Sequence, residues 1–195
     1  MGNVLMKHEE SSLKRYLYEY AFLLGVAGVI VALDQWTKWL VRTRLDFNES
    51  WAPWDWLLPY ARIVHIQNTG AAFGSFQAFG NVFLVLAIIV SLGILIFFTR
   101  VAQNDWLLRV VMSMELGGAC GNLVDRFTQR YVTDFVSLGN FAVFNVADAC
   151  ISVGVTILIV GMLIREWKQK QMSGSHADTT APSPPEPQQE NPSGE

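Results

Sequence analysis

Charged side chains that could do acid–base chemistry, and amide side chains that could orient them, lie at the ends of long apolar stretches in this sequence. A charged group at the centre of a membrane helix costs about 2.5–3.5 kcal/mol on insertion scales, so each such group needs a partner. Four separate parts of the chain bring these side chains to the same end of an apolar run. They are Asp34 and Lys38, then Asn68, then Asn122 with Asp125 and Arg126, and finally Asp134 with Asn145 and Asp148. This convergence predicts a functional site at one membrane depth.

Two of these carboxylates suit peptide hydrolysis. Asp134 alternates with Val132 and Val136 along a strand-like run, so facing a helix bundle it would be partly desolvated and its pKa raised. If Asp148 meets it, the two carboxylates share a proton, as in aspartic proteases. One then activates water as a general base, while the protonated one polarises the scissile carbonyl. For Asp148 taken alone, the alternative is that it serves only as a helix cap whose carboxylate the helix dipole stabilises.

Two further groups have helical spacing. Asp34 and Lys38 are four residues apart, so on a continuing helix they share a face and can form an ion pair. The alternative is an interfacial pair in which Lys38 extends to water. Asn122, Asp125 and Arg126 lie at i, i+3 and i+4, and therefore also share one helix face.

Small residues, GGACG at 117–121, come just before this last group and allow a second helix to approach closely. For Gly117 and Gly118 we expect helix packing alone. Cys120 and Cys150 lie in apolar runs without a CxxC or cysteine–histidine cluster, so we expect neither zinc nor a disulfide framework. HExxH and Gly-x-Ser-x-Gly are absent as well, so neither a zinc protease nor a serine hydrolase is favoured.

The elements that must position these groups are membrane helices. Of the 195 residues, 51% are hydrophobic and 16% charged, against about 25% charged in a typical soluble domain. The mean hydropathy is +0.28, and neither the net charge of −3 nor any basic block points to nucleic acid. About 20 helical residues cross the hydrocarbon core. Four stretches have this character, at about residues 16–37, 81–99, 106–124 and 145–164.

The distribution of basic residues predicts the orientation. Arg165, Lys168 and Lys170 closely follow the fourth stretch, and no basic residue lies between Arg130 and its start. Because basic residues favour the cytoplasmic side, we expect both termini to be cytoplasmic. The tryptophans fall near the ends of the apolar stretches, as interfacial rings do. The first stretch lacks a small-x-small cleavage site and is interpreted as a retained helix rather than a signal peptide.

The segments outside the helices have their own patterns. Residues 61–67 and 130–136 are strand-like and predict a small sheet that caps the helices. Residues 51–58 fit either a short element lying on the membrane or an ordinary proline-containing loop. Residues 173–195 are rich in proline, serine, glutamate and glutamine, which predicts a disordered cytoplasmic tail after a membrane domain of residues 1–172.

Five blocks in this order resemble the lipoprotein signal peptidase family, also called signal peptidase II. They are DQWTK at 34–38, NTGAAFG at 68–74, GNLVDR at 121–126, YVTDF at 131–135 and FNVAD at 144–148. Any one block is weak, but the ordered set is specific. The resemblance implies an all-α membrane bundle of four transmembrane helices with a small extracytoplasmic β-cradle, in the inner membrane of a bacterium.

The resemblance also implies an activity and its residues. The family cuts prolipoproteins before a lipobox cysteine that carries diacylglycerol, needs no metal or cofactor, and is inhibited by globomycin. By motif position the catalytic pair is Asp134 and Asp148. Residues that bind substrate or support the site would be Asp34, Lys38, Asn68, Gly70, Gly121, Asn122, Asp125, Arg126, Asn145 and Ala147. The resemblance further implies contact with membrane lipid, a monomeric enzyme and an active site near the extracytoplasmic face.

Two other classes of protein compete with the peptidase. A small proton-coupled transporter would use carboxylates near mid-membrane, and Glu115 is the one candidate within the third stretch. A structural scaffold would leave the costly cluster of Asp134, Asp148 and Arg126 without a purpose. Both alternatives account for less of the sequence than the peptidase does.

Overall fold

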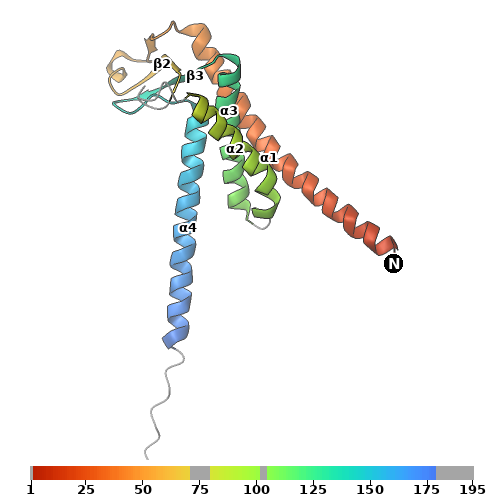
Figure 1. Cartoon of the computed structure of the whole chain (residues 1–195). Coiled ribbons are helices and arrows are strands. Elements are labelled where there is room, and N and C mark those ends of the chain that lie inside the picture. The colour runs from red at the N-terminus through yellow and green to blue at the C-terminus, as the bar shows by residue number, and fades with distance from the viewer. Residues whose placement is uncertain (1, 71–79, 102–104, 179–195) are drawn as a thin grey trace, which may run out of the picture. The chain divides into compact units, whose positions relative to one another are not determined.

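The computed structural model describes residues 2–70, 80–101 and 105–178 and divides the chain into two compact units, Met1–Leu158 and Ile159–Glu195 (Figure 1). The first unit holds three helices, a sheet and the start of the fourth helix; the second holds the rest of that helix. The helices are α1 (Gly2–Arg44), α2 (Gly80–Val101), α3 (Trp106–Thr128) and α4 (Val146–Asp178). The strands are β1 (Ser50–Trp51), β2 (Ala61–Asn68) and β3 (Val132–Leu138), with a 3-10 turn, η1, at Asp55–Leu57.

All four helices are long and apolar enough to cross a membrane, which confirms the predicted architecture. The candidate spans are Leu13–Arg44, Asn81–Val101, Trp106–Thr128 and Val146–Gln171. All four extend beyond the ends of the predicted stretches, the first and fourth by the most. α4 continues to Asp178, past the predicted domain boundary at residue 172, and the remainder of the predicted tail lies outside the described residues.

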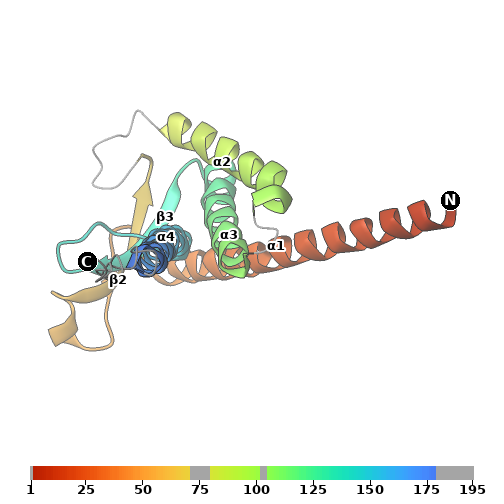
Figure 2. The ribbon, with the colours of Figure 1, turned by 90° about the horizontal axis from the view of Figure 1, so that it is seen from below.

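The third helix is the centre of the bundle. Half of its apolar stretch is buried, against 17% in α1 and 11% in α2, and it lies between these two helices (Figure 2). Leu23, Ala27, Phe98 and Leu116 form the core where the three helices meet. The outward faces of α1 and α2 are apolar and exposed, as expected of surfaces that meet lipid.

Glycines make the close approach to α3 possible. A Cβ at Gly117 would lie 2.8 Å from Cβ of Ile30 on α1, and one at Gly118 would lie 2.6 Å from the carbonyl oxygen of Ala147 on α4. Neither distance is tolerable for a real side chain. The prediction that these two glycines serve helix packing is confirmed.

The three strands form one antiparallel sheet in the order β1-β2-β3. Asp134 is paired with Ile66, and a register shift between Ile63 and Ile66 bends β2. Arg130 has a φ of +69° in the turn that leads from α3 into β3, so the strand starts at Val132 rather than at residue 130 as predicted. The predicted pairing of the two strand-like runs is confirmed, whereas β1 was not predicted.

The sheet lies at the end of the bundle where the chemistry-bearing side chains are. α1 and α3 end there, and α2 and α4 begin there, because each of these helices is joined to a strand at that end (Figure 1). In the segment at 51–58 the structure has both a short strand and the turn η1, with the rings of Trp54 and Trp56 stacked at 6.0 Å.

Candidate active site

One face of α1 carries a buried ion cluster. Lys38 Nζ lies 2.7 Å from Asp34 Oδ2 and 3.2 Å from Asp125 Oδ2 of α3, and all three side chains have 0% exposure. The predicted ion pair at i, i+4 is therefore present. The alternative in which Lys38 reaches out to water is wrong, because two carboxylates hold the ammonium inside the protein.

Asp125 joins this cluster to the start of β3. Its Oδ2 accepts a hydrogen bond of 2.9 Å from the backbone N–H of Thr133. The Arg42 guanidinium donates to Thr133 Oγ1 at 3.0 Å and lies 3.5 Å from Asp125 Oδ1. Gln35 donates to both Asp34 and Asp125 and to the carbonyl oxygen of Gly121. The residue that precedes Asp134 is thus fixed from two helices.

Gln35, Arg42 and Thr133 were not among the predicted site residues. Arg42 lies four residues after Lys38, so the helical spacing that links Asp34 to Lys38 extends to it. Gln35 stands inside the DQWTK block that carried the resemblance. Thr133 likewise stands inside the YVTDF block, but residue type could not have indicated that its backbone N–H would donate to Asp125.

Two small residues make room for the Asp34 carboxylate. Its Oδ1 accepts a 2.9 Å hydrogen bond from the N–H of Ala147, one of the unpaired donors in the first turn of α4. A Cβ at Gly121 would lie 2.7 Å from Asp34 Oδ2. The negative carboxylate at the start of α4 is stabilised by the helix dipole as well.

Asn145 and Asp148 cap α4 reciprocally. The N–H of Asp148 donates to Asn145 Oδ1 at 3.0 Å, and the N–H of Asn145 donates to Asp148 Oδ2 at 3.3 Å. This is the arrangement of a capping box. Asp148 therefore does act as a cap, but the cap uses only one of its oxygens.

The other oxygen of Asp148 belongs to a network that reaches Asp134. Asn122 Nδ2 donates to Asp148 Oδ1 at 2.8 Å, while Asn122 Oδ1 accepts from Lys38 Nζ at 3.0 Å. Asn145 Nδ2 donates to Asp134 Oδ1 at 2.8 Å and to Asn122 Oδ1 at 3.2 Å. Each amide has its oxygen on donors and its nitrogen on carboxylates, which fixes both amide orientations.

Asp134 is the more enclosed carboxylate, with 3% exposure, whereas Asp148 is half-buried. Asp134 Oδ2 accepts a hydrogen bond of 2.9 Å from Asn68 Nδ2. Asn68 is itself held in orientation by the N–H of Gly70, which donates to Asn68 Oδ1 at 3.0 Å. Burial, with help from the Asp148 charge, raises the pKa of Asp134 to about 6, and the amide donors and Lys38 oppose this rise.

Arg126 completes the group. Its guanidinium is half-buried, lies 3.5 Å from the carbonyl oxygen of Asn122, and interacts electrostatically with Asp148, Asp134 and Asp125. The structure thus brings all twelve predicted site residues into one region. Part of the NTGAAFG block, residues 71–74, lies outside the described residues.

The cluster has two layers. Asp34, Lys38 and Asp125 form a closed ion cluster behind the site, and Asp134 and Asp148 form a front layer of carboxylates that amides hold in place. Two carboxylates that differ in burial can hold one proton between them and act as an acid and a base.

Comparison with known proteins identifies this arrangement. The sequence profile of signal peptidase (SPase) II matches residues 26–164. The chain belongs to the signal peptidase II family. It is therefore a protease, and the transporter and scaffold alternatives are wrong. Glu115, on which the transporter depended, lies against Gly154 of α4, two turns of α3 away from Asn122.

Relatives cover most of the chain. A lipoprotein signal peptidase of Halalkalibacterium halodurans is 39% identical over 150 residues, which are 75% of this chain and 94% of that protein. One of Mesorhizobium japonicum is 37% identical over 156 residues, or 77% and 88% of the two chains. A solved structure of a bacterial membrane enzyme matches with a TM-score of 0.66 at 28% identity, over 72% of this chain and 87% of that one. The chain therefore shares its fold with a bacterial membrane enzyme, which confirms the predicted bundle of four membrane helices with a small sheet.

Proposed function

We propose that this chain is an aspartyl endopeptidase that removes signal peptides from diacylglyceryl-modified prolipoproteins by cutting before the lipidated cysteine. The observation that supports this most is the amide network from Asp134 through Asn145 and Asn122 to Asp148. It holds two carboxylates from different elements at the end of the membrane spans, where a lipid-anchored peptide meets water. The relatives are named lipoprotein signal peptidases, which supports the substrate class.

The two carboxylates have different tasks in this mechanism. Asp134 holds the proton, because burial raises its pKa to about 6, and Asp148, in its more open position, acts as the general base. Asp148 takes a proton from water while the hydroxide bonds to the scissile carbonyl carbon. Asp134 passes its proton to the carbonyl oxygen at the same time. A substrate that displaces water from the site raises the pKa of Asp134 further, which favours this state.

Collapse of the tetrahedral intermediate returns the protons. Asp148 donates its proton to the leaving nitrogen as the carbon–nitrogen bond breaks, and the hydroxyl proton of the intermediate goes back to Asp134. Arg126 supplies positive charge beside both carboxylates and favours the anionic state of the pair. No cofactor takes part in any step.

The proposal includes the location of the site. Basic residues after α4 support cytoplasmic termini in a bacterial inner membrane, which puts the Asp134–Asp148 pair at the extracytoplasmic face. We propose further that globomycin-type peptides bind at the pair, that the enzyme acts as a monomer, and that residues 173–195 form a cytoplasmic tail outside the catalytic domain. Truncation after Met172 should leave cleavage unchanged in the purified enzyme.

Cleavage of a purified precursor tests the mechanism. Asp134→Asn and Asp148→Asn should each abolish release of the signal peptide from diacylglyceryl-modified prolipoprotein, with membrane insertion and Tm retained. Asp55→Asn, at an exposed position of η1, is the matched control and should cleave normally. An unmodified precursor should be a poor substrate for every variant. Full cleavage by either of the first two variants would remove the carboxylate mechanism.

A further inference from the structure

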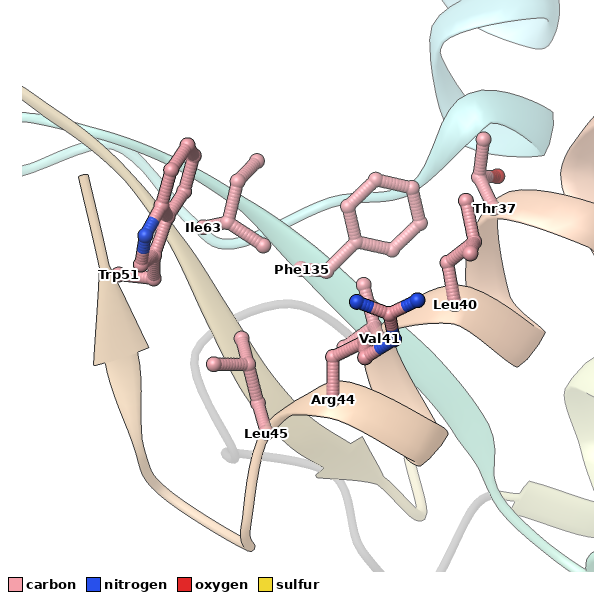
Figure 3. A pocket seen from close by; sticks show the side chains of 8 residues that line it. All are labelled: Thr37, Leu40, Val41, Arg44, Leu45, Trp51, Ile63 and Phe135. Carbon is pink, nitrogen blue, oxygen red and sulfur yellow. The ribbon is translucent and has the colours of Figure 1, made fainter. Parts of the chain in front are cut away.

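A groove between the end of α1 and the sheet lies apart from the catalytic network (Figure 3). Its volume is about 650 Å³, within the range of about 300–1,000 Å³ typical of ligand pockets. The side chains that line it are mostly apolar, among them Leu40, Val41, Leu45, Ile63 and Phe135. Arg44, the last residue of α1, is the one charged group among the described residues that line it.

The groove and the carboxylates lie on opposite faces of β3. Successive residues of a strand point to opposite sides, so Phe135 faces the groove while Asp134 faces Asn145 and Asn68. One edge of β3 is paired with β2, and Val136 bridges Phe144 on the other side. An acyl chain attached to a substrate at Asp134 would have to pass around this strand to enter the groove. The occupant is therefore a separate molecule.

The depth of the groove indicates what that molecule is. Its α1 wall is the last part of the Leu13–Arg44 span, where Trp36 and Trp39 are exposed, and the exposed Trp51 lines the groove itself. Tryptophan favours the headgroup level of a bilayer. An apolar hollow that opens there meets lipid chains, and a guanidinium at its rim meets phosphate groups.

We propose that this groove binds one anionic phospholipid of the surrounding membrane, with an acyl chain against Ile63 and Phe135 and the phosphate at Arg44. The single positive charge at the edge of an otherwise apolar lining matches a lipid with one negative headgroup. The bound chain packs against the side of β3 behind Asp134 and stabilises the folded peptidase by mass action.

Native mass spectrometry of the purified full chain tests this proposal. The probes are phosphatidylglycerol, phosphatidylcholine with the same chains, and glycerol phosphate, which has the headgroup chemistry but no chain. We expect the protein to retain one phosphatidylglycerol molecule tightly, to bind phosphatidylcholine more weakly and to bind no glycerol phosphate. Arg44→Gln should lower the affinity for phosphatidylglycerol about fivefold, which is the effect of one basic residue at an anionic lipid surface. Arg62→Gln is the control, because Arg62 is exposed and alternates with Ile63 on β2.

Filling the groove is the second arm. Ile63→Trp and Leu45→Trp each put an indole where the chain would lie, and should abolish retention while the variants still cleave precursor, which shows that they fold. If Arg44→Gln and Arg62→Gln lowered the affinity for phosphatidylglycerol equally, the lipid would be held by diffuse surface attraction and not by a specific site, which would overturn the proposal. Unchanged retention in both tryptophan variants would overturn the location. Displacement of the phospholipid by diacylglyceryl-modified precursor would instead assign the groove to the lipid of the substrate.

Discussion

Replacing Lys38 by methionine tests whether the buried ion cluster holds the site together. The side chain keeps its length, but two fully buried carboxylates, Asp34 at 2.7 Å and Asp125 at 3.2 Å, lose the ammonium between them. Removing one partner of a buried pair costs about 3–5 kcal/mol, because the charge left behind is unpaired. For a chain of this size, about 2–4 °C per kcal/mol turns that loss into a fall in Tm of roughly 6–20 °C.

The chain contains a matched control for this change. Lys170 and Glu166 have the same i, i+4 spacing at 3.3 Å, but their side chains are 76% and 61% exposed. Exposed helix pairs are worth about 0.3–0.5 kcal/mol, so Lys170→Met should move Tm by no more than about 2 °C. Adding Asp34→Asn to Lys38→Met removes one unpaired carboxylate, keeps an oxygen for the Ala147 N–H, and should recover part of the loss.

Thermal unfolding in detergent and precursor cleavage are the two measurements. Cleavage by Lys38→Met should fall even at temperatures where the variant is folded, because Asn122 loses the shorter of the two hydrogen bonds to Oδ1 that hold its amide toward Asp148. If Lys38→Met melts within 2 °C of the unmodified chain, as Lys170→Met should, then burial does not give the ion cluster its strength and this reasoning is wrong.

Three other perturbations follow from the same contacts. Gly121→Ala puts a methyl group 2.7 Å from Asp34 Oδ2 and should cost about 1–3 kcal/mol in thermal unfolding, whereas Gly28→Ala, with open space around it, should not destabilise; equal Tm values would contradict this. Asn145→Ala removes donors to Asp134 and Asn122 and the cap of α4, so kcat should fall about 10²-fold, and a change below threefold would count against the network. The rate kcat/KM should fall as pH rises through about 6, because Asp134 must hold a proton and loses it above its raised pKa. A profile that is flat between about pH 5 and 8 would exclude Asp134 as the proton holder.

Local sequence was sufficient to predict the four helices and two of the three strands. Apolar stretches of about 20 residues and β-branched alternation act over a few residues, so the four spans and the strands β2 and β3 were predictable. The end of α1 was not predictable in this way. The predicted stretch ended at about residue 37, yet the helix continues to Arg44. Asp34, Lys38 and Arg42 can remain helical inside the protein because α3 and β3 supply their partners.

The motif blocks likewise identified the site residues but not their connections. Spacing along the chain could not show that Asp125 pairs with Lys38 rather than facing the carboxylates in front, or that Asp148 both caps α4 and accepts from Asn122. The sequence by itself therefore determined which side chains meet at one membrane depth. Only the tertiary structure decided which oxygen meets which donor, because contacts such as Ala147 N–H to Asp34 join residues 113 positions apart and depend on how closely the helices pack.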